Sequence, residues 1–256
     1  MTLKISLIDK LLRNSNTKKL RNFLGIRPSL DLIDYTSDSI SASDAFFWRT
    51  DNNYETIFKF TNILRYFYNI SNSSVKLVFF SNNNEFIKDH DISSPNNLSE
   101  ILINKSFLNN IESYGVFYVF HETEQKLQTI IRNSCYTGYS LKNNIPSMVH
   151  GNTVTAKKKF YHKKIDYGIG GYSFLKKRTY TVQNNFKPEQ TEIMLVNPTN
   201  IEISVKVNEK IFTLKKGCSK LINIGKNNLI KVTSKCYLLR PIIFERKDDF
   251  INVYHG

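Results

Sequence analysis

The sequence predicts a mainly β protein, in which a β-rich region with short N-terminal helices precedes an antiparallel Ig-like β-sandwich. Two observations predict this class. Turn-forming residues interrupt short apolar runs roughly every 8–12 residues along the last third of the chain. The chain also lacks the alternation of strands and long helices that a Rossmann or TIM architecture requires. We therefore expect a basic helical segment at 1–28, a β-rich domain with one or two helices at 29–176, and an antiparallel β-sandwich domain at 177–256.

The N-terminal segment has the residue spacing of amphipathic helices. Leu3, Leu7 and Leu11 recur at helical steps among basic residues, and a second short helix with Leu20 and Leu24 would end at the following glycine. Such a basic helix packs its apolar face on its own domain or on a sister subunit, or it lies on an anionic membrane surface. The apolar stripe is short and lacks Trp, which favours packing.

The middle of the chain is rich in predicted strands, although their spacing is less regular. Residues 44–60 predict a hairpin that closes at 51–53, and residues 73–87 predict a second hairpin. Residues 114–122 predict a strand. Residues 125–133 form either a strand or one helical turn, and a strand at 125–131 would pair with 114–121. Residues 97–110 have apolar residues at helical steps after a polar cap residue, so they predict a helix.

The C-terminal third gives the clearest strand signal. Ile203, Val205 and Val207 alternate with polar residues, which places them on one face of a strand. The intervening segments contain Asn, Gly and Pro, which favour turns. We place strands near 178–183, 190–196, 201–207, 210–214, 219–224, 229–234 and 238–245.

Composition points to a cytoplasmic protein without a metal or other cofactor. The chain has 256 residues, which is enough for a large core. We find neither a secretory signal nor an apolar run of the ~18 residues needed for a transmembrane helix. The three Cys have neither the spacing of a zinc site nor that of a disulfide framework. The strand edges of a small sandwich make a homo-oligomer a further expectation.

Positive charge is concentrated in two short segments. The net charge is +14, and residues 1–28 carry seven basic side chains and one acidic one. Residues 157–178 carry eight basic side chains and one acidic one, interleaved with aromatic residues and glycines. Lysines neutralise phosphates or carboxylates, and aromatic rings stack on bases or sugars. This second segment is either a solvated surface hairpin or an anion-binding face.

A second candidate region runs from 132 to 152, just before the basic segment. Arg would hold a carboxylate or phosphate in its planar fork, Tyr would stack on a ring, and His would donate a hydrogen bond or transfer a proton. We expect both regions to meet in one concave basic site. The ligand-binding candidates are Arg132, Tyr136, Tyr139, His150, Asn152, Lys157, Lys158, Lys159, Tyr161, Lys163 and Lys164. Arg49, beside the single Trp, is a lesser candidate for an exposed anion contact.

Three functions are compatible with these patterns. The first is a non-catalytic binding protein for an anionic ligand, an acidic glycan or a sugar phosphate. The second is a carbohydrate-active enzyme, an isomerase, lyase or transferase. Its catalytic candidates are His121, Glu122 and His150, acting with Arg132 and Tyr136. The third is a nucleic-acid-binding protein, which the net charge permits although the chain lacks the usual nucleic-acid-binding motifs. Whether the protein is an enzyme stays open.

Overall fold

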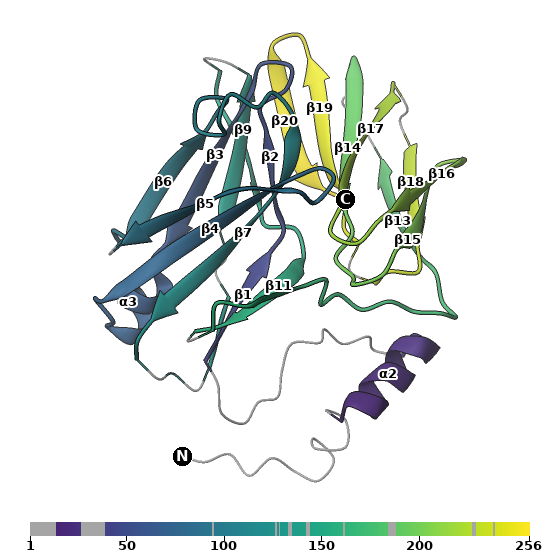
Figure 1. The fold of residues 1–256 in the computed structure, drawn as a ribbon. Coiled ribbons are helices and arrows are strands. Elements are labelled where there is room, and N and C mark those ends of the chain that lie inside the picture. The colour runs from purple at the N-terminus through teal and green to yellow at the C-terminus, as the bar shows by residue number, and fades with distance from the viewer. Residues whose placement is uncertain are drawn as a thin grey trace.

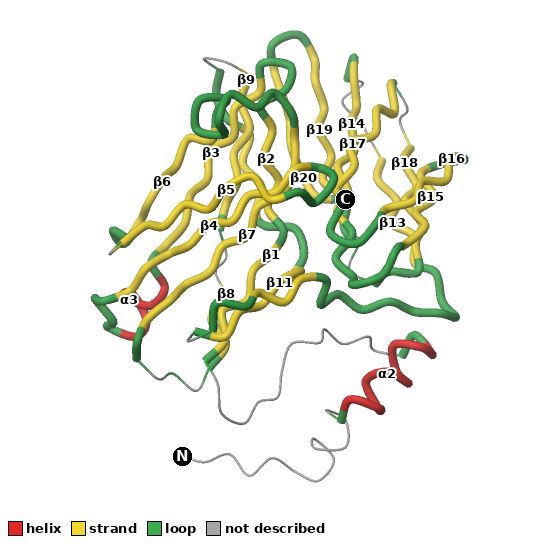
Figure 2. Tube along the Cα trace, in the orientation of Figure 1, coloured by secondary structure: helices red, strands yellow, loops and turns green. Residues whose placement is uncertain are grey.

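The fold is mainly β in the described part of the chain (Figure 1). The computed structural model describes residues 14–26, 39–93, 95–125, 127, 129–132, 135–141, 144–160, 162–183, 188–226, 229–237 and 239–256. These residues contain two helices, α2 (Ser15–Leu24) and α3 (Ile63–Tyr68), which Figure 2 shows beside the far more extensive strands. Neither helix has the length and apolar character needed to cross a bilayer.

The described strands form five sheets of four strands each. A five-bladed β-propeller has the same number of sheets. Sheet A contains β12 (Ile165–Tyr167), β11 (Val154–Lys159), β1 (Ile40–Asp44) and β8 (Ile130–Arg132). Sheet B contains β2 (Phe46–Arg49), β7 (Tyr114–Thr123), β4 (Ser73–Ser81) and β5 (Phe86–Ser93). Sheet C contains β10 (Ser147–His150), β9 (Tyr136–Leu141), β3 (Tyr54–Thr61) and β6 (Leu98–Ile103).

The last two sheets are built from the C-terminal third. Sheet D contains β13 (Arg178–Gln183), β18 (Leu229–Ser234), β15 (Ile203–Val207) and β16 (Lys210–Leu214). Sheet E contains β17 (Ser219–Gly225), β14 (Gln190–Val196), β19 (Ile242–Lys247) and β20 (Phe250–His255). Within each of these two sheets all the pairings are antiparallel.

The predicted fold class, a β-rich domain followed by an Ig-like sandwich, is wrong. The mainly β composition is confirmed, but the strands are divided among five small sheets. The physical reason lies in β14, which is buried on both faces. Ile193 and Leu195 pack with sheet D, whereas Met194 and Val196 pack with apolar residues of sheets B and C. A two-layer sandwich would leave one face of this strand in water. The predicted division at residue 176 stays a prediction, although one hydrophobic cluster crosses it.

A second core lies between sheets B and C and is dominated by aromatic rings. Phe46 stacks on Phe117 with 5.4 Å between the ring centroids, and Phe58 meets Phe117 edge-on at 5.0 Å. Trp48 is fully buried beside them, and its indole N–H donates to the Phe80 carbonyl at 2.9 Å. Trp48 is therefore a residue of this second core.

Several predicted elements are found at their expected places. The strands predicted in the C-terminal third correspond to β13–β19, within a few residues at their ends, and the hairpin at 73–87 is β4–β5. The turn at 51–53 forms with Asn52 and Asn53 in the left-handed region, but the strands on either side join different sheets. Two predictions are wrong. Residues 98–103 form the strand β6 rather than a helix, and β8 pairs in parallel with β1 rather than with β7.

The predicted short helix near Leu20 is confirmed as α2. Asn14 caps its first turn by accepting a hydrogen bond from the Asn16 amide at 2.9 Å. Gly25 ends it with φ of 71°, a left-handed conformation that glycine adopts without strain. The preceding helical stretch predicted around residues 3–12 lies outside the described residues.

Candidate anion-binding site

Strand geometry separates the three consecutive lysines of β11. Side chains alternate along a strand, so Lys158 points opposite to its two neighbours. Lys158 is buried and forms an ion pair with Glu122 of β7. Lys157 is half-buried on the other side, and Lys159 is exposed. The Lys157 side chain therefore lies at the surface that carries the candidate site, whereas the Lys158 side chain is buried in its ion pair with Glu122.

The glycine-rich segment after β12 packs on another backbone segment. The Gly170 N–H donates to the Pro198 carbonyl at 2.6 Å, and Ile169 forms a β-bridge with Thr199. A Cβ atom on Gly168 would lie 2.5 Å from the Thr199 carbonyl oxygen, and its φ of 74° also favours glycine. These glycines allow two loops to pack together. Their backbone therefore lies close to residues 198–199 of the same chain.

Helix α2 lies against the segment that follows these glycines. The Ser173 hydroxyl donates to the Phe23 carbonyl at 3.4 Å, and the Phe23 and Phe174 rings lie 5.6 Å apart. The C-terminal end of the helix packs closely on Tyr237 and Lys176. A Cβ atom on Gly25 would overlap the Tyr237 hydroxyl and would lie 3.0 Å from the Lys176 Cβ. These contacts place the described part of the N-terminal basic segment beside the second basic segment.

A basic groove of about 740 Å³ lies between these elements. Four separate segments supply its charged lining: α2, β11, the approach to β12, and the turn between β16 and β17. We call this the lysine groove, and its charged lining residues are Lys18, Lys19, Lys157, Lys164, Lys216 and Asp166. Lys164 and Asp166 are 3.8 Å apart and both well exposed, so water screens their attraction. The groove thus carries an excess of positive charge.

Aromatic rings supply the apolar part of the lysine groove. Tyr172 and Phe174 meet edge-on with 5.2 Å between their centroids, and Phe174 is 55% exposed. Tyr167 is more firmly held, because its ring packs against Phe80 and Tyr118. Burial raises the pKa of Tyr167, so its hydroxyl is neutral at physiological pH. The groove can therefore offer ammonium groups to an anion and ring faces to a sugar or another ring.

The two candidate regions do not share the lysine groove in the described part of the chain. None of the described residues that line the lysine groove belongs to 132–152. Arg132 makes a bidentate ion pair with Asp44, with N–O distances of 2.8 and 2.9 Å. Tyr139 is fully buried and donates to the Phe47 carbonyl, and Asn152 is also buried. Neither buried side chain is accessible to a ligand.

The remaining ligand candidates lie in several places. Tyr136 and His150 are paired neighbours on β9 and β10, with Tyr136 half-exposed. Lys163 is exposed near the lysine groove but is not among its lining residues. Tyr161 lies outside the described residues.

The predicted acid–base residues do not form one site. His121 is buried within β7, and burial lowers its pKa to about 4. Glu122 is paired with Lys158, whereas His150 contacts His255, with 3.1 Å between the ring nitrogens. Burial also raises the pKa of Cys135, which disfavours a thiolate nucleophile. Within the described part of the chain, no three His, Cys, Asp or Glu side chains converge to bind a metal.

The groove-lining lysines from outside 157–178 are the candidate residues that the sequence prediction missed. Lys18 and Lys19 belong to the other basic segment, and their charge was a visible signal. Their position in a helix favoured packing as the interpretation, and nothing in the chain indicated that the two segments would meet. Lys216 had no signal, because a lysine in a turn is usually solvated.

Comparisons with known proteins identify no relatives. No protein-family model matches the chain, and no curated protein matches it. Among solved structures, the major pilin protein T-13 from Streptococcus pyogenes is 9% identical with a TM-score of 0.21, over 84% of this chain and 97% of the pilin. The major pilin protein T3.2 from the same organism is 7% identical with a TM-score of 0.21, over 84% of this chain and 98% of the pilin.

Proposed function

We propose that this protein binds an anionic ligand, an acidic glycan or a sugar phosphate, in the lysine groove. The observation that carries the proposal is the convergence of five lysines from four chain segments, with one aspartate, among the described residues that line the groove. Clefts lined by charges of one sign attract ligands of the opposite sign. The volume of about 740 Å³ suits a small molecule or a few sugar rings.

The aromatic lining supports a ligand that has a ring as well as a negative charge. Phe174 is exposed beside Tyr172, so a sugar could stack there while its phosphate, sulfate or carboxylate contacts the lysines. Lysine ammonium groups are point charges without a fixed geometry. The groove should therefore select for charge and ring shape more than for one anion.

Charge reversal tests the proposal. We expect the triple variant Lys19→Glu, Lys164→Glu, Lys216→Glu to weaken binding of a sulfated oligosaccharide or a hexose phosphate by at least ~10-fold at low salt. The three side chains are exposed and come from separate segments, so the fold should persist. Isothermal titration calorimetry at several salt concentrations measures the affinity and its salt dependence.

The matched control carries the same change of charge away from the groove. The control variant is Lys226→Glu, Lys231→Glu, Lys247→Glu, whose side chains are exposed and do not line the groove. Its affinity should stay within ~3-fold of the unmodified protein. Equal loss in both triple variants would show non-specific attraction and refute the site. Tighter binding of single-stranded RNA than of any saccharide would refute the ligand class.

A further inference from the structure

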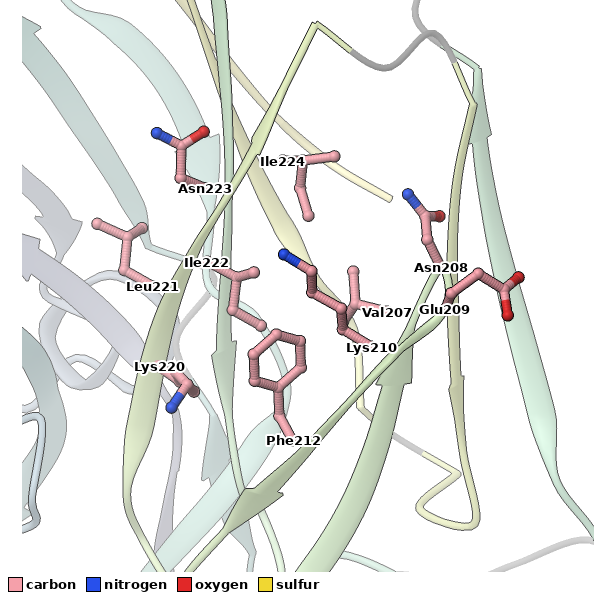
Figure 3. A pocket seen from close by; sticks show the side chains of 10 residues that line it. All are labelled: Val207, Asn208, Glu209, Lys210, Phe212, Lys220, Leu221, Ile222, Asn223 and Ile224. Carbon is pink, nitrogen blue, oxygen red and sulfur yellow. The ribbon is translucent and has the colours of Figure 1, made fainter.

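A second groove separates the outermost strands of sheets D and E. Among the described strands, β16 pairs only with β15, and β17 pairs only with β14. Between the two outer strands lies an opening of about 520 Å³, which Figure 3 shows with its lining side chains. We call it the edge groove. Residues 220–224 line it without interruption, so it runs along the edge of β17.

The interior of the edge groove is apolar because two strand faces converge there. Val205 pairs with Phe212 across sheet D, so Phe212 shares the inward face of that buried valine. On β17, Ile222 and Ile224 lie two residues apart and share a face, and Ile222 is 6% exposed. Figure 3 shows Phe212 beside Ile222 in the gap between their strands. Phe212 and Ile224 are only partly buried and form the mouth.

The outer edge of β17 already accepts a backbone partner at its first residue. The Ser219 N–H donates to the Asn82 carbonyl at 2.9 Å, and Asn82 belongs to the turn between β4 and β5. Backbone N–H groups alternate in direction along a strand. The N–H groups of Leu221 and Asn223 are therefore directed toward the same outer edge as that of Ser219. This edge is a template for an added strand.

Positive charge at the edge groove selects among the partners that such an edge can bind. Lys210 and Lys220 line the groove, and the Lys220 ammonium lies 5.4 Å from the Phe212 ring centroid. Glu209 is the one acidic residue among the described lining residues; it is exposed to solvent and 3.2 Å from Lys206, so the two lysines outnumber it at the groove. A second copy of this chain would bring the same lysines against themselves. The charge therefore favours an acidic partner over self-association.

We propose that the outer edge of β17 binds an extended acidic segment of another protein by strand addition. The backbone of the added strand pairs with the outward groups of Leu221 and Asn223. Its groove-facing side chains alternate with solvent-facing ones, so that apolar residues cover Phe212 and Ile224. Acidic residues beside them meet Lys210 and Lys220. This interaction uses a surface separate from the lysine groove.

A designed peptide tests the proposal on the full chain. The probe Thr-Glu-Thr-Val-Thr-Val-Thr-Glu-Thr presents two valines flanked by glutamates on one face, and its pattern reads the same in either direction. Fluorescence anisotropy of the labelled peptide should show saturable binding. Two control peptides should each bind at least ~10-fold more weakly. In the first, Lys replaces both glutamates, and in the second, the backbone amides on the pairing edge are N-methylated. Equal binding of all three peptides overturns the proposal.

Two matched protein variants locate the interaction. Asn223→Pro removes one outward N–H, whereas Asn223→Thr keeps it, and both lose the amide oxygen that accepts a hydrogen bond from the Gly225 N–H. We expect Asn223→Pro to weaken peptide binding by ~10-fold or more and Asn223→Thr to preserve it. Should Asn223→Pro not fold, Lys210→Glu with Lys220→Glu provides the same test, with Lys231→Glu as control.

Hydrogen exchange and sedimentation supply the decisive readouts. Bound peptide should slow amide exchange in residues 220–224. Protection confined to another strand overturns the assignment. A concentration-dependent dimer that Asn223→Pro abolishes would identify a second copy as the occupant and would also overturn the proposal.

Discussion

At the scale of single residues, Arg49 shows how burial changes the role of a charged side chain. The expectation of an exposed anion contact is wrong, because the Arg49 side chain is fully buried. Its guanidinium binds Asp51 at 2.8 and 3.0 Å and Glu192 at 2.7 Å, and it lies over the Tyr54 ring at 3.9 Å. Burial alone would lower the pKa of Arg49, but the hydrogen bonds and negative charges of Asp51 and Glu192 raise it.

We expect Arg49→Ala to lower the free energy of unfolding by roughly 3–5 kcal/mol, because it leaves the buried Glu192 carboxylate without its partner. Urea denaturation measures the change. The double variant Arg49→Met, Glu192→Gln should recover part of the loss, since no uncompensated charge remains. The exposed pair of Lys59 and Glu100 provides the control, and Lys59→Ala should cost less than ~1 kcal/mol. Similar losses for both pairs would contradict this account.

At the scale of elements, the turn between β14 and β15 depends on one buried amide. The Asn197 side-chain NH₂ donates to the carbonyls of Ile201, Leu214 and Lys215 at 2.7–3.1 Å. Its side-chain oxygen accepts from the backbone and the hydroxyl of Thr199. This turn also receives the glycine segment beside the lysine groove. One side chain therefore joins three parts of the fold.

Asn197→Asp should destabilise the protein by roughly 2–3 kcal/mol, because a carboxylate cannot donate to the three buried carbonyls. Thermal unfolding followed by circular dichroism detects the change. Asn200 is exposed in the same turn, and Asn200→Asp should change stability by less than ~0.5 kcal/mol. A neutral Asn197→Asp variant would show that water replaces these hydrogen bonds.

Strand positions in the C-terminal third could be predicted from the sequence, but the sheets could not. Alternation in 203–207 and the turns on either side are local signals, and they placed β15 and its neighbours correctly. Sheet partners depend on contacts distant in sequence, such as β1 with β11 and β8. The misassigned β6 has apolar residues that also satisfy a helical spacing, and its pairing with β3 decides the outcome.

The candidate site was predictable only as a set of charges. The excess of lysines in 1–28 and 157–178 was visible in the sequence, and the lysine groove contains residues of both segments. Strand alternation in β11 then assigns Lys158 to the interior. No local pattern could reveal that Glu122 would lie opposite it, because that pairing depends on how sheets A and B pack. The segment 132–152 has reactive residue types, but several of them contact residues outside it. Arg132 pairs with Asp44, Tyr139 donates to the Phe47 carbonyl, and His150 contacts His255.

At the scale of the whole molecule, one buried histidine and one half-buried histidine predict a stability that depends on pH. Burial lowers the pKa of His121 to about 4. The pKa of His255 is also lowered to about 4, by burial first and then by the charges of Arg240 and His150. The unfolded chain, with histidine pKa values near ~6.5, binds more protons below that pH. The free energy of unfolding should therefore fall as the pH drops from ~6.5 to ~4.

The lowered pKa of His121 should reduce the free energy of unfolding by about 3 kcal/mol between pH 7 and pH 4. Urea denaturation between pH 7 and pH 4 measures it, and His121→Gln should flatten this part of the profile. His162 is exposed, so His162→Gln should leave the profile unchanged. Identical slopes in His121→Gln and the unmodified protein would show that His121 does not cause the acid sensitivity.

The burial of β14 on both faces limits which substitutions the protein can tolerate in this strand. Adjacent residues of β14 face two different cores. Enlarging Met194 or Val196 displaces partners from both halves of the chain, whereas enlarging Ile193 or Leu195 displaces partners from the C-terminal third. Sequence variation should therefore be tolerated least in β14 and most at the outermost strands. Those peripheral strands are also the ones that border both proposed binding surfaces, so new ligand preferences can arise there without disturbing the shared interior.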